Sequence, residues 1–320
     1  MGIIKIIFLL LFLHISMLAK NNICIYINSY HKGYEWSDTI TKEIKTRLKD
    51  SCKIIQFDLD SKRKKDKESI EAKALEAKKL IDDTNPDIVL FSDDNAAKYL
   101  VKPYYQDSKI PFLFCGINWT AKEYGFPYKN NMKGIIEVLP VDSILKIATR
   151  LSTGKYGIFI GDNTITDKKD LSYLEKSAKR KNITLDSKLV NNVEEWKNTY
   201  LMAQEKYDFI VLGHNSAIKG WNDEDVLSFL EKNSKKFSFS TYSWMMPFSM
   251  IGNIIKAEEH GQWISNAAIA ILNDYDIKNI SITTNKSWNN YVNFKLLKAA
   301  NLKLPREVKT KYKKYNMSIN

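Results

Sequence analysis

The chain has 320 residues, of which 44% are hydrophobic, and it carries a formal net charge of +12 at pH 7. This length and composition predict a globular protein with enough apolar side chains for two packed domains. The basic excess does not favour a nucleic-acid partner, because lysines and acids alternate along segments such as SKRKKDKESIEAKALEAKK (61–79), a pattern typical of solvated helix faces.

The first 19 residues combine Lys5, an unbroken apolar run from Ile6 to Leu13 and a small residue, Ala19, before the sequence turns polar. This order predicts a secretory signal peptide at 1–19. A retained membrane anchor is the alternative, but the apolar run is shorter than the ~20 residues that a membrane-spanning helix needs. We therefore expect an exported protein, periplasmic or otherwise extracytoplasmic.

Three cysteines, Cys24, Cys52 and Cys115, are too few for a disulfide scaffold. None has the spacing of a metal or redox site, and buried free thiols are the favoured interpretation. Cys24 and Cys52 each open a predicted strand, so a bridge between them is the alternative if those strands are neighbours.

Beyond the signal, short β-rich apolar runs alternate with longer helical periods. Strands are predicted at 23–29, 53–59, 87–93 and 111–117, with helices around 35–49, 67–82 and 95–106. The alternation resumes with strands at 156–162, 183–190, 208–215 and 237–244, and with helices that end near 181, pass through Trp196, and cover 223–232 and 257–273. Continuous apolar strands between amphipathic helices predict parallel sheets covered on both faces.

The two halves also share a short similarity, DIVLFSDDNAA from Asp87 and DFIVLGHNSAI from Asp208. We therefore predict an α/β fold of two doubly wound parallel-sheet lobes with a ligand cleft between them. Lobe one is expected at 20–136 plus 250–278 and lobe two at 137–249 plus 279–320, with GIIEVLP (134–140) as the first crossing between them.

Ligands of doubly wound sheets bind beyond the carboxyl ends of the strands. The residues predicted there are aromatic, acidic, amide or hydroxyl side chains: Ser29, Tyr30, His31, Tyr34, Trp36, Asp93, Asp94, Asn95, Asn118, Trp119, Asp162, His214, Asn215, Tyr242 and Trp244. Such a set suits a small polar molecule with a flat part. Asp94 is expected to accept a hydrogen bond from the ligand, while Trp36 faces Tyr242 or Trp244 across the cleft.

Catalysis and metal binding are not favoured, because the chain contains no HExxH, GxSxG, P-loop or GxGxxG motif. His31 and His214 could form a metal or acid–base pair with Asp93 or Asp94, but hydrogen-bonding or structural roles are preferred. We expect no catalytic residue, no metal and no cofactor.

Three segments resemble the type I periplasmic binding proteins, in particular ABC-transporter substrate-binding components related to those for aromatic amino acids. They are DIVLFSDDNAAKYL (87–100) followed by IPFLFCGIN (110–118), then EHGQWISNAAIAILND (259–274), and NYVNFKLLKAANLKLPREV (290–308). The resemblance implies two lobes joined by three crossing strands that close on a ligand by hinge motion. The long aromatic loop after the first strand, the turn SDDN (92–95) and Asp274 depart from the family pattern, so the resemblance does not name the ligand.

The function expected from these observations is a non-enzymatic solute-binding protein. Its expected partners are a small-molecule ligand and an ABC permease or membrane receptor, with no nucleic acid. The alternative is a ligand sensor that docks on a separate membrane receptor or histidine kinase, and neighbouring genes would discriminate the two. The protein is expected to be a monomer. An aromatic amino acid, a purine-like base, another amine-bearing heterocycle or a sugar all fit the predicted cleft.

Overall fold

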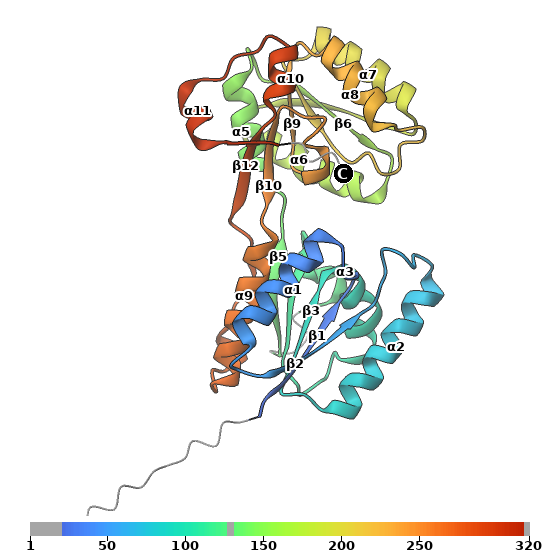
Figure 1. Cartoon of the computed structure of the whole chain (residues 1–320), viewed down its shortest axis with the longest axis vertical. Coiled ribbons are helices and arrows are strands. Elements are labelled where there is room, and N and C mark those ends of the chain that lie inside the picture. The colour runs from blue at the N-terminus through green and yellow to red at the C-terminus, as the bar shows by residue number, and fades with distance from the viewer. Residues whose placement is uncertain (1–20, 127–130, 317–320) are drawn as a thin grey trace, which may run out of the picture.

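The computed structural model describes residues 21–126 and 131–316. The predicted signal peptide at 1–19 lies outside this range. Figure 1 shows two α/β lobes, one above the other, that are connected along one side. Within the described residues, no helix is long and apolar enough to cross a membrane.

The first lobe is built on a six-stranded parallel sheet with the order β11-β5-β4-β3-β1-β2. Its strands are β1 (Ile23–Asn28), β2 (Lys53–Asp58), β3 (Ile88–Ser92), β4 (Phe112–Asn118), β5 (Met132–Glu137) and β11 (Thr283–Thr284). Its helices are α1 (Glu35–Leu48), α2 (Lys67–Thr84), α3 (Asp93–Ala96), η1 (Ala97–Val101), α4 (Lys102–Tyr104), η2 (Ala121–Tyr124), α9 (Ala257–Leu272) and η4 (Ile277–Asn279). Two apolar clusters cover the two faces of this sheet.

The second lobe contains a seven-stranded sheet with the order β13-β12-β10-β9-β8-β6-β7. Its strands are β6 (Tyr156–Asp162), β7 (Thr184–Val190), β8 (Phe209–Leu212), β9 (Phe237–Ser240), β10 (Ile251–Ile255), β12 (Trp288–Val292) and β13 (Lys313–Lys314). Its helices are α5 (Val141–Leu151), α6 (Ile165–Arg180), α7 (Val193–Lys206), α8 (Asp223–Asn233), η3 (Ser243–Met245), α10 (Phe294–Ala299) and α11 (Arg306–Lys311). The pairing is parallel except between β10 and β12.

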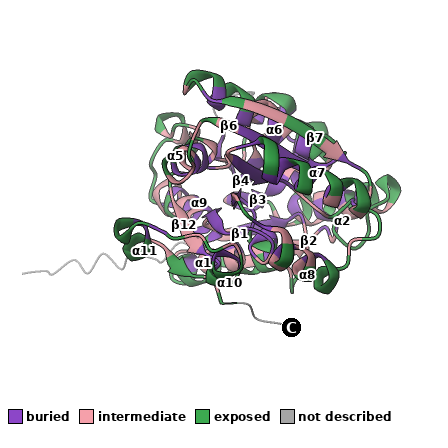
Figure 2. Ribbon diagram, turned by 90° about the horizontal axis from the view of Figure 1, so that it is seen from above, coloured by how far each residue is buried: buried purple, intermediate pink, exposed green. Residues whose placement is uncertain are grey.

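The expected α/β class with two parallel-dominated sheets is confirmed. Figure 2 shows why the alternation in the sequence was informative: buried residues gather in the strands, while the outer faces of the helices are exposed. A strand such as β3 is buried at every position, so it reads as a continuous apolar run rather than an alternating one.

The chain passes between the lobes three times, after β5, after β10 and after β11. Hydrogen bonds between side chains and backbone N–H groups hold these crossings together. The Glu259 carboxylate accepts the N–H groups of Lys286 and Ser287, each at 2.8 Å, and Asn285 Oδ1 accepts the N–H of Val138 at 2.7 Å.

The sheets differ from the expected lobe limits at two short pieces. β10 pairs with β9 and β12 in the second sheet, although residues 250–278 were expected in lobe one. β11 pairs with β5 in the first sheet, although 279–320 was expected in lobe two. Both pieces lie beside a crossing, where the pairing partner depends on the tertiary structure and leaves no local signal.

The favoured interpretation of the cysteines is corrected. Cys24 and Cys52 form a disulfide, and only Cys115 is a buried free thiol. β1 and β2 are parallel neighbours in which Ile23 lies opposite Lys53, so the two cysteines stand at the same end of adjacent strands.

Candidate functional site: the interlobe cleft

A cavity of about 1130 Å³ lies between the lobes and is lined by both of them. Nine of the expected ligand residues line it: Tyr30, Tyr34, Trp36, Asp93, Asp94, Asn118, His214, Tyr242 and Trp244. They come from the carboxyl ends of β1, β3, β4, β8 and β9, where parallel strands deliver their following loops to one edge.

The other six expected residues do not line this cavity: Ser29, His31, Asn95, Trp119, Asp162 and Asn215. Most of them hold loops. Ser29 Oγ donates to the carbonyl of Ser92 at 2.5 Å, and Asn95 Nδ2 donates to Ser61 Oγ at 2.7 Å. Asp162 is fully buried and accepts the N–H of Ala217 at 3.1 Å.

Asp93 is the most exceptional side chain of the cleft. Its backbone is left-handed with φ 68°, an uncommon conformation for a residue other than glycine. It is 2% exposed, Trp36 Nε1 donates to its Oδ1 at 3.0 Å, and Oδ2 has no hydrogen-bond partner among the described residues. Burial, reinforced by the charge of Asp94, raises the pKa of the Asp93 carboxyl to about 7.

Asp94, the residue expected to accept a hydrogen bond from the ligand, already accepts hydrogen bonds within the protein. Tyr124 OH donates to its Oδ1 at 2.7 Å, and Asn118 Nδ2 donates to its Oδ2 at 2.6 Å. Both oxygens therefore tie β3 to the β4 loop, whereas Oδ2 of the preceding residue, Asp93, is buried without a hydrogen-bond partner among the described residues.

The cleft is strongly acidic. Six carboxylates line it, against two lysines: Glu35, Asp93, Asp94, Glu137, Asp170 and Glu258 against Lys62 and Lys314. Burial and the neighbouring charges of Asp93 and Asp94 raise the pKa of Glu137 well above its usual range. Such an environment attracts a positive charge and disfavours an anion.

Aromatic rings form walls on both lobes. On the second lobe, the ring centroids of His214 and Tyr242 are 4.0 Å apart, and Trp244 stacks 5.0 Å from Tyr242. On the first lobe, Tyr30 and Tyr34 meet edge to face at 5.1 Å. Trp244 is 45% exposed, so its ring is available to stack against a flat ligand.

A set of contacts between the β4 loop and α6 connects the lobes directly; we call it the rim contact. Trp119 stacks on Tyr173 with centroids 3.8 Å apart, and its Nε1 donates to Asp170 Oδ1 at 2.6 Å. Lys169 pairs with Glu123 at 2.8 Å. Trp119 thus joins the lobes instead of lining the cavity.

No family model matches the chain, and no curated protein matches its sequence. Among solved structures, a ligand-free, open substrate-binding protein with adhesive properties from Clostridium difficile superposes with a TM-score of 0.74 at 13% identity, covering 93% of this chain and 100% of that one.

An ABC domain in complex with L-Trp from Streptococcus pneumoniae gives 0.62 at 16% identity, covering 91% and 99%. A LacI-family transcriptional regulator from Bifidobacterium animalis gives 0.56 at 10% identity, covering 83% and 95%. The chain has the type I periplasmic-binding-protein fold. At these identities the likeness establishes the fold alone, so the function has to be argued from the cleft.

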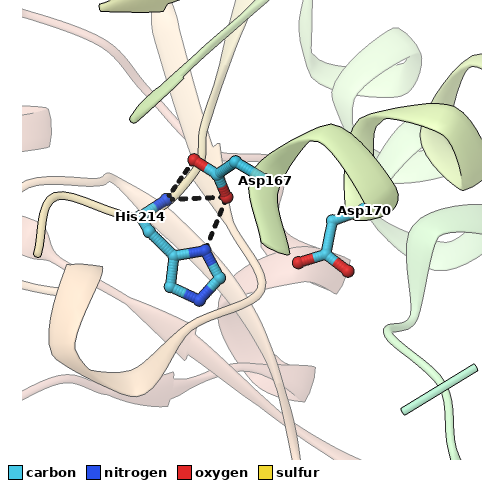
Figure 3. A group of neighbouring side chains, drawn as sticks. All are labelled: Asp167, Asp170 and His214. Carbon is cyan, nitrogen blue, oxygen red and sulfur yellow. Dashed lines mark hydrogen bonds and ion pairs between the residues drawn. The ribbon is translucent and has the colours of Figure 1, made fainter. Parts of the chain in front are cut away.

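Within this binding-protein fold, Asp167, Asp170 and His214 offer atoms within 4.8 Å of one another, as a metal site would require (Figure 3). The carboxylate oxygens of this group already accept hydrogen bonds from the protein. Asp167 accepts His214 Nδ1 at 2.5 Å and the N–H of Asp162 at 2.7 Å, and Asp170 accepts Tyr242 OH at 2.5 Å besides Trp119. All four carboxylate oxygens therefore accept a protein hydrogen bond, which makes the group a hydrogen-bonded support for the aromatic wall.

Several polar residues of the binding-protein cleft were not among the expected ligand residues, and Lys62, Glu137 and Asp170 are the ones that matter most for its charge. Lys62 belongs to a charge run and Asp170 to the interior of a helix, so neither stands out. Glu137 had a usable signal, because it is the one carboxylate in the apolar crossing segment GIIEVLP.

Proposed function

We propose that this protein is an extracytoplasmic solute-binding protein that captures a small amine-bearing molecule with a flat apolar part and delivers it to an ABC permease. The single observation that carries the proposal is Asp93, a buried carboxylate that lines an acidic, aromatic-walled cavity and whose Oδ2 has no hydrogen-bond partner among the described residues. A buried carboxylate is costly unless a hydrogen-bonded cation pairs with it, and a ligand ammonium would supply that pairing.

The flat part of the ligand would lie against Trp244 on the second lobe, since that ring is partly exposed in the cavity. The L-Trp complex of the Streptococcus pneumoniae domain supports a ligand of this kind on the same fold.

Native mass spectrometry of freshly purified protein tests the capture of a solute directly, and the accurate mass of a retained molecule would name it. Uptake of that molecule by cells with and without the gene then tests delivery. A protein that retains nothing and binds no molecule from a metabolite panel would contradict the proposal.

The anchoring role is tested with Asp93→Asn, which keeps the side-chain shape and removes the charge. A charge-assisted hydrogen bond contributes roughly 1.5–3 kcal/mol, so calorimetry at pH 8 should show affinity for the identified amine reduced tenfold or more. Glu258→Gln is the matched control, because it removes an exposed carboxylate from the same lining. Equal affinities of the parent and Asp93→Asn would place the anchor elsewhere.

A further inference from the structure

Lys62 is held beside the aromatic pair of the first lobe by a built loop connection. It follows β2, and the residues just before it are bound to the loop after β1. Asp60 N–H donates to the carbonyl of Tyr30 at 2.9 Å, and Ser61 Oγ donates to the carbonyl of Ser29 at 2.7 Å. Ser61 Oγ also accepts a hydrogen bond from Asn95 Nδ2 at 2.7 Å. Three hydrogen bonds therefore hold this part of the loop in place.

The ammonium of Lys62 lies over both rings of that pair. Its Nζ is 4.7 Å from the centroid of Tyr30 and 5.1 Å from that of Tyr34, within the range of a cation–π contact. It also faces the acidic side of the cavity. Burial lowers the pKa of Lys62, whereas the negative charges of Asp93 and Glu137 favour its protonated form.

The position of this ammonium is therefore the one that a ligand cation would take: over two aromatic faces and within the electrostatic influence of Asp93 and Glu137. We propose that Lys62 is a tethered competitor for the ligand's ammonium, occupying the cation position of the cleft until a cationic solute displaces it. This inference rests on the proposed function, because it concerns the same cleft and the same class of solute.

The consequence for selectivity follows from charge. A cationic solute exchanges one ammonium for another, so Asp93 and the tyrosines keep a positive partner throughout. A neutral molecule of the same shape cannot make this exchange, and it would have to displace Lys62 while leaving the carboxylates without a counter-charge. Lys62 thus reduces the apparent affinity for a cationic solute, because only the molecules in which it has left the rings can bind. It also excludes neutral analogues.

A different role for Lys62 predicts the opposite sign. If its ammonium bound an anionic group of the solute, removing it would weaken binding. The test is therefore the direction of the affinity change in Lys62→Gln. The side chain of Lys62 is exposed by its accessible surface, although its ammonium is partly desolvated in the cleft, so this substitution leaves the core untouched.

The probe is tryptamine, an arylethylammonium, and its neutral counterpart is tryptophol, which has a hydroxyl in place of the amine. By calorimetry at pH 8, Lys62→Gln should bind tryptamine at least ~5-fold more tightly than the parent, corresponding to a position that Lys62 fills about four-fifths of the time. Tryptophol should bind the parent more weakly than tryptamine does, and its affinity should also rise in Lys62→Gln, because no ammonium then has to be displaced from the rings.

Lys314→Gln is the matched control, since Lys314 lines the same cavity and the substitution removes the same charge. If general electrostatics were responsible, Lys314→Gln would reproduce the gain. Equal gains in the two variants, or an equal or weaker affinity of Lys62→Gln, would overturn the inference. So would the absence of tryptamine binding to both parent and variant at millimolar concentration. In that case a non-cationic solute found by native mass spectrometry would leave the solute-binding function standing while this inference fails.

A second readout follows Lys62 itself. Reductive methylation with ¹³C-formaldehyde labels the lysines, and the signal missing from Lys62→Gln assigns Lys62 in the parent spectrum. Ring currents of Tyr30 and Tyr34 should shift this signal upfield, and saturating tryptamine should return it to the position of exposed lysines. A Lys62 signal that stays in place at saturation would contradict displacement.

Discussion

Asp93 and Gly116 form a pair in which each residue explains the other. Asp93 sits in the left-handed region, where a side chain costs ~1 kcal/mol or more. Gly116, with φ 71°, lies so close that a Cβ there would be 2.9 Å from Asp93 Oδ1. Only glycine fits at 116 without moving the carboxylate, so the strained geometry is preserved by the neighbouring strand. Backbone strain of this kind at a cavity is typical of a functional position.

His260 supports the same corner from behind. It is fully buried on α9, its Nδ1 accepts the N–H of Gly116 at 3.2 Å, and its ring lies 5.2 Å from that of Trp36. Nε2 has no hydrogen-bond partner among the described residues. Burial lowers the pKa of His260 to about 3, so the folded protein keeps this imidazole neutral.

Acid should therefore destabilise the protein through His260. Between pH 6.5 and about 3 the unfolded chain binds a proton at this residue and the folded chain does not, so the free energy of unfolding falls by ~1.4 kcal/mol per pH unit. His260→Asn keeps an acceptor for Gly116 and removes the titration. Urea unfolding at pH 7.5, 5.5 and 4.5 should show the parent losing its advantage over the variant as the pH falls.

Asp93 acts in the opposite direction, because its raised pKa lets the folded state bind the extra proton below about 7. This contribution favours the folded state at low pH and is lost as the pH rises through 7. It is common to the parent and His260→Asn, so it cancels in their difference. A difference that stays constant from pH 7.5 to 4.5 would show that His260 is not neutral in the folded state.

At the scale of elements, the disulfide joins the starts of β1 and β2. Its cysteines are 28 residues apart, and the closed loop contains the whole of α1 and the aromatic loop of the cleft. In the chain-entropy model a loop of this length stabilises the folded state by roughly 3–4 kcal/mol, because the bridge restricts the unfolded chain. β2 lies at the edge of its sheet, so the bridge also secures an outer strand.

The variant Cys24→Ala/Cys52→Ala should be less stable than the oxidised parent by ~2–4 kcal/mol in urea unfolding. Reductant should lower the stability of the parent to a similar degree and leave the double variant unchanged, which separates the bridge from the packing of the two sulfurs. A parent that is insensitive to reductant in the unfolding transition region would show that the bridge is not formed in solution.

α6 illustrates how one helix serves both the cleft and the connection between lobes. Its residues 167 and 170 are spaced i, i+3 and so share a face. Asp167 holds His214 in the second lobe, whereas Asp170 accepts one hydrogen bond from Tyr242 and one from Trp119 of the first lobe. The aromatic wall and the rim contact thus share a carboxylate.

At the scale of the whole molecule, the three crossings connect the lobes along one side (Figure 1). The rim contact connects them a second time, through the β4 loop and α6. The stack of Trp119 on Tyr173 contributes ~0.5–1.5 kcal/mol beyond its area, and the hydrogen bond to Asp170 adds roughly 1.5–3 kcal/mol. A loss of ~1.4 kcal/mol or more shifts the balance between closed and open forms tenfold or more.

Trp119→Ala should therefore open the molecule. Small-angle X-ray scattering should give a larger radius of gyration for this variant than for the parent, with an unchanged circular dichroism spectrum. Tyr173→Phe is the control, because it keeps the stacked ring. Identical scattering curves for the parent and Trp119→Ala would show that the rim contact does not set the interlobe angle.

The sequence by itself determined the elements and the class of fold. Apolar runs such as 23–29 and 87–93 became β1 and β3, and the helix expected at 257–273 became α9, since strand and helix periodicity are local properties of the chain. The resemblance to periplasmic binding proteins was confirmed at the level of fold. Strand ends also located the cleft correctly, because parallel strands deliver their loops to one edge.

Only the tertiary structure decided which polar groups face the cleft and which hold it together. Asp93 and Asp94 are adjacent in the sequence. Asp93 keeps an oxygen without a hydrogen-bond partner among the described residues, whereas both oxygens of Asp94 accept hydrogen bonds, from Tyr124 and Asn118. Lys62, Glu137 and Asp170 enter from a loop, a crossing strand and a helix interior, and Cys52 meets Cys24 because two strands are neighbours. These outcomes depend on distances between segments far apart in the chain, and local pattern carries no information about such distances.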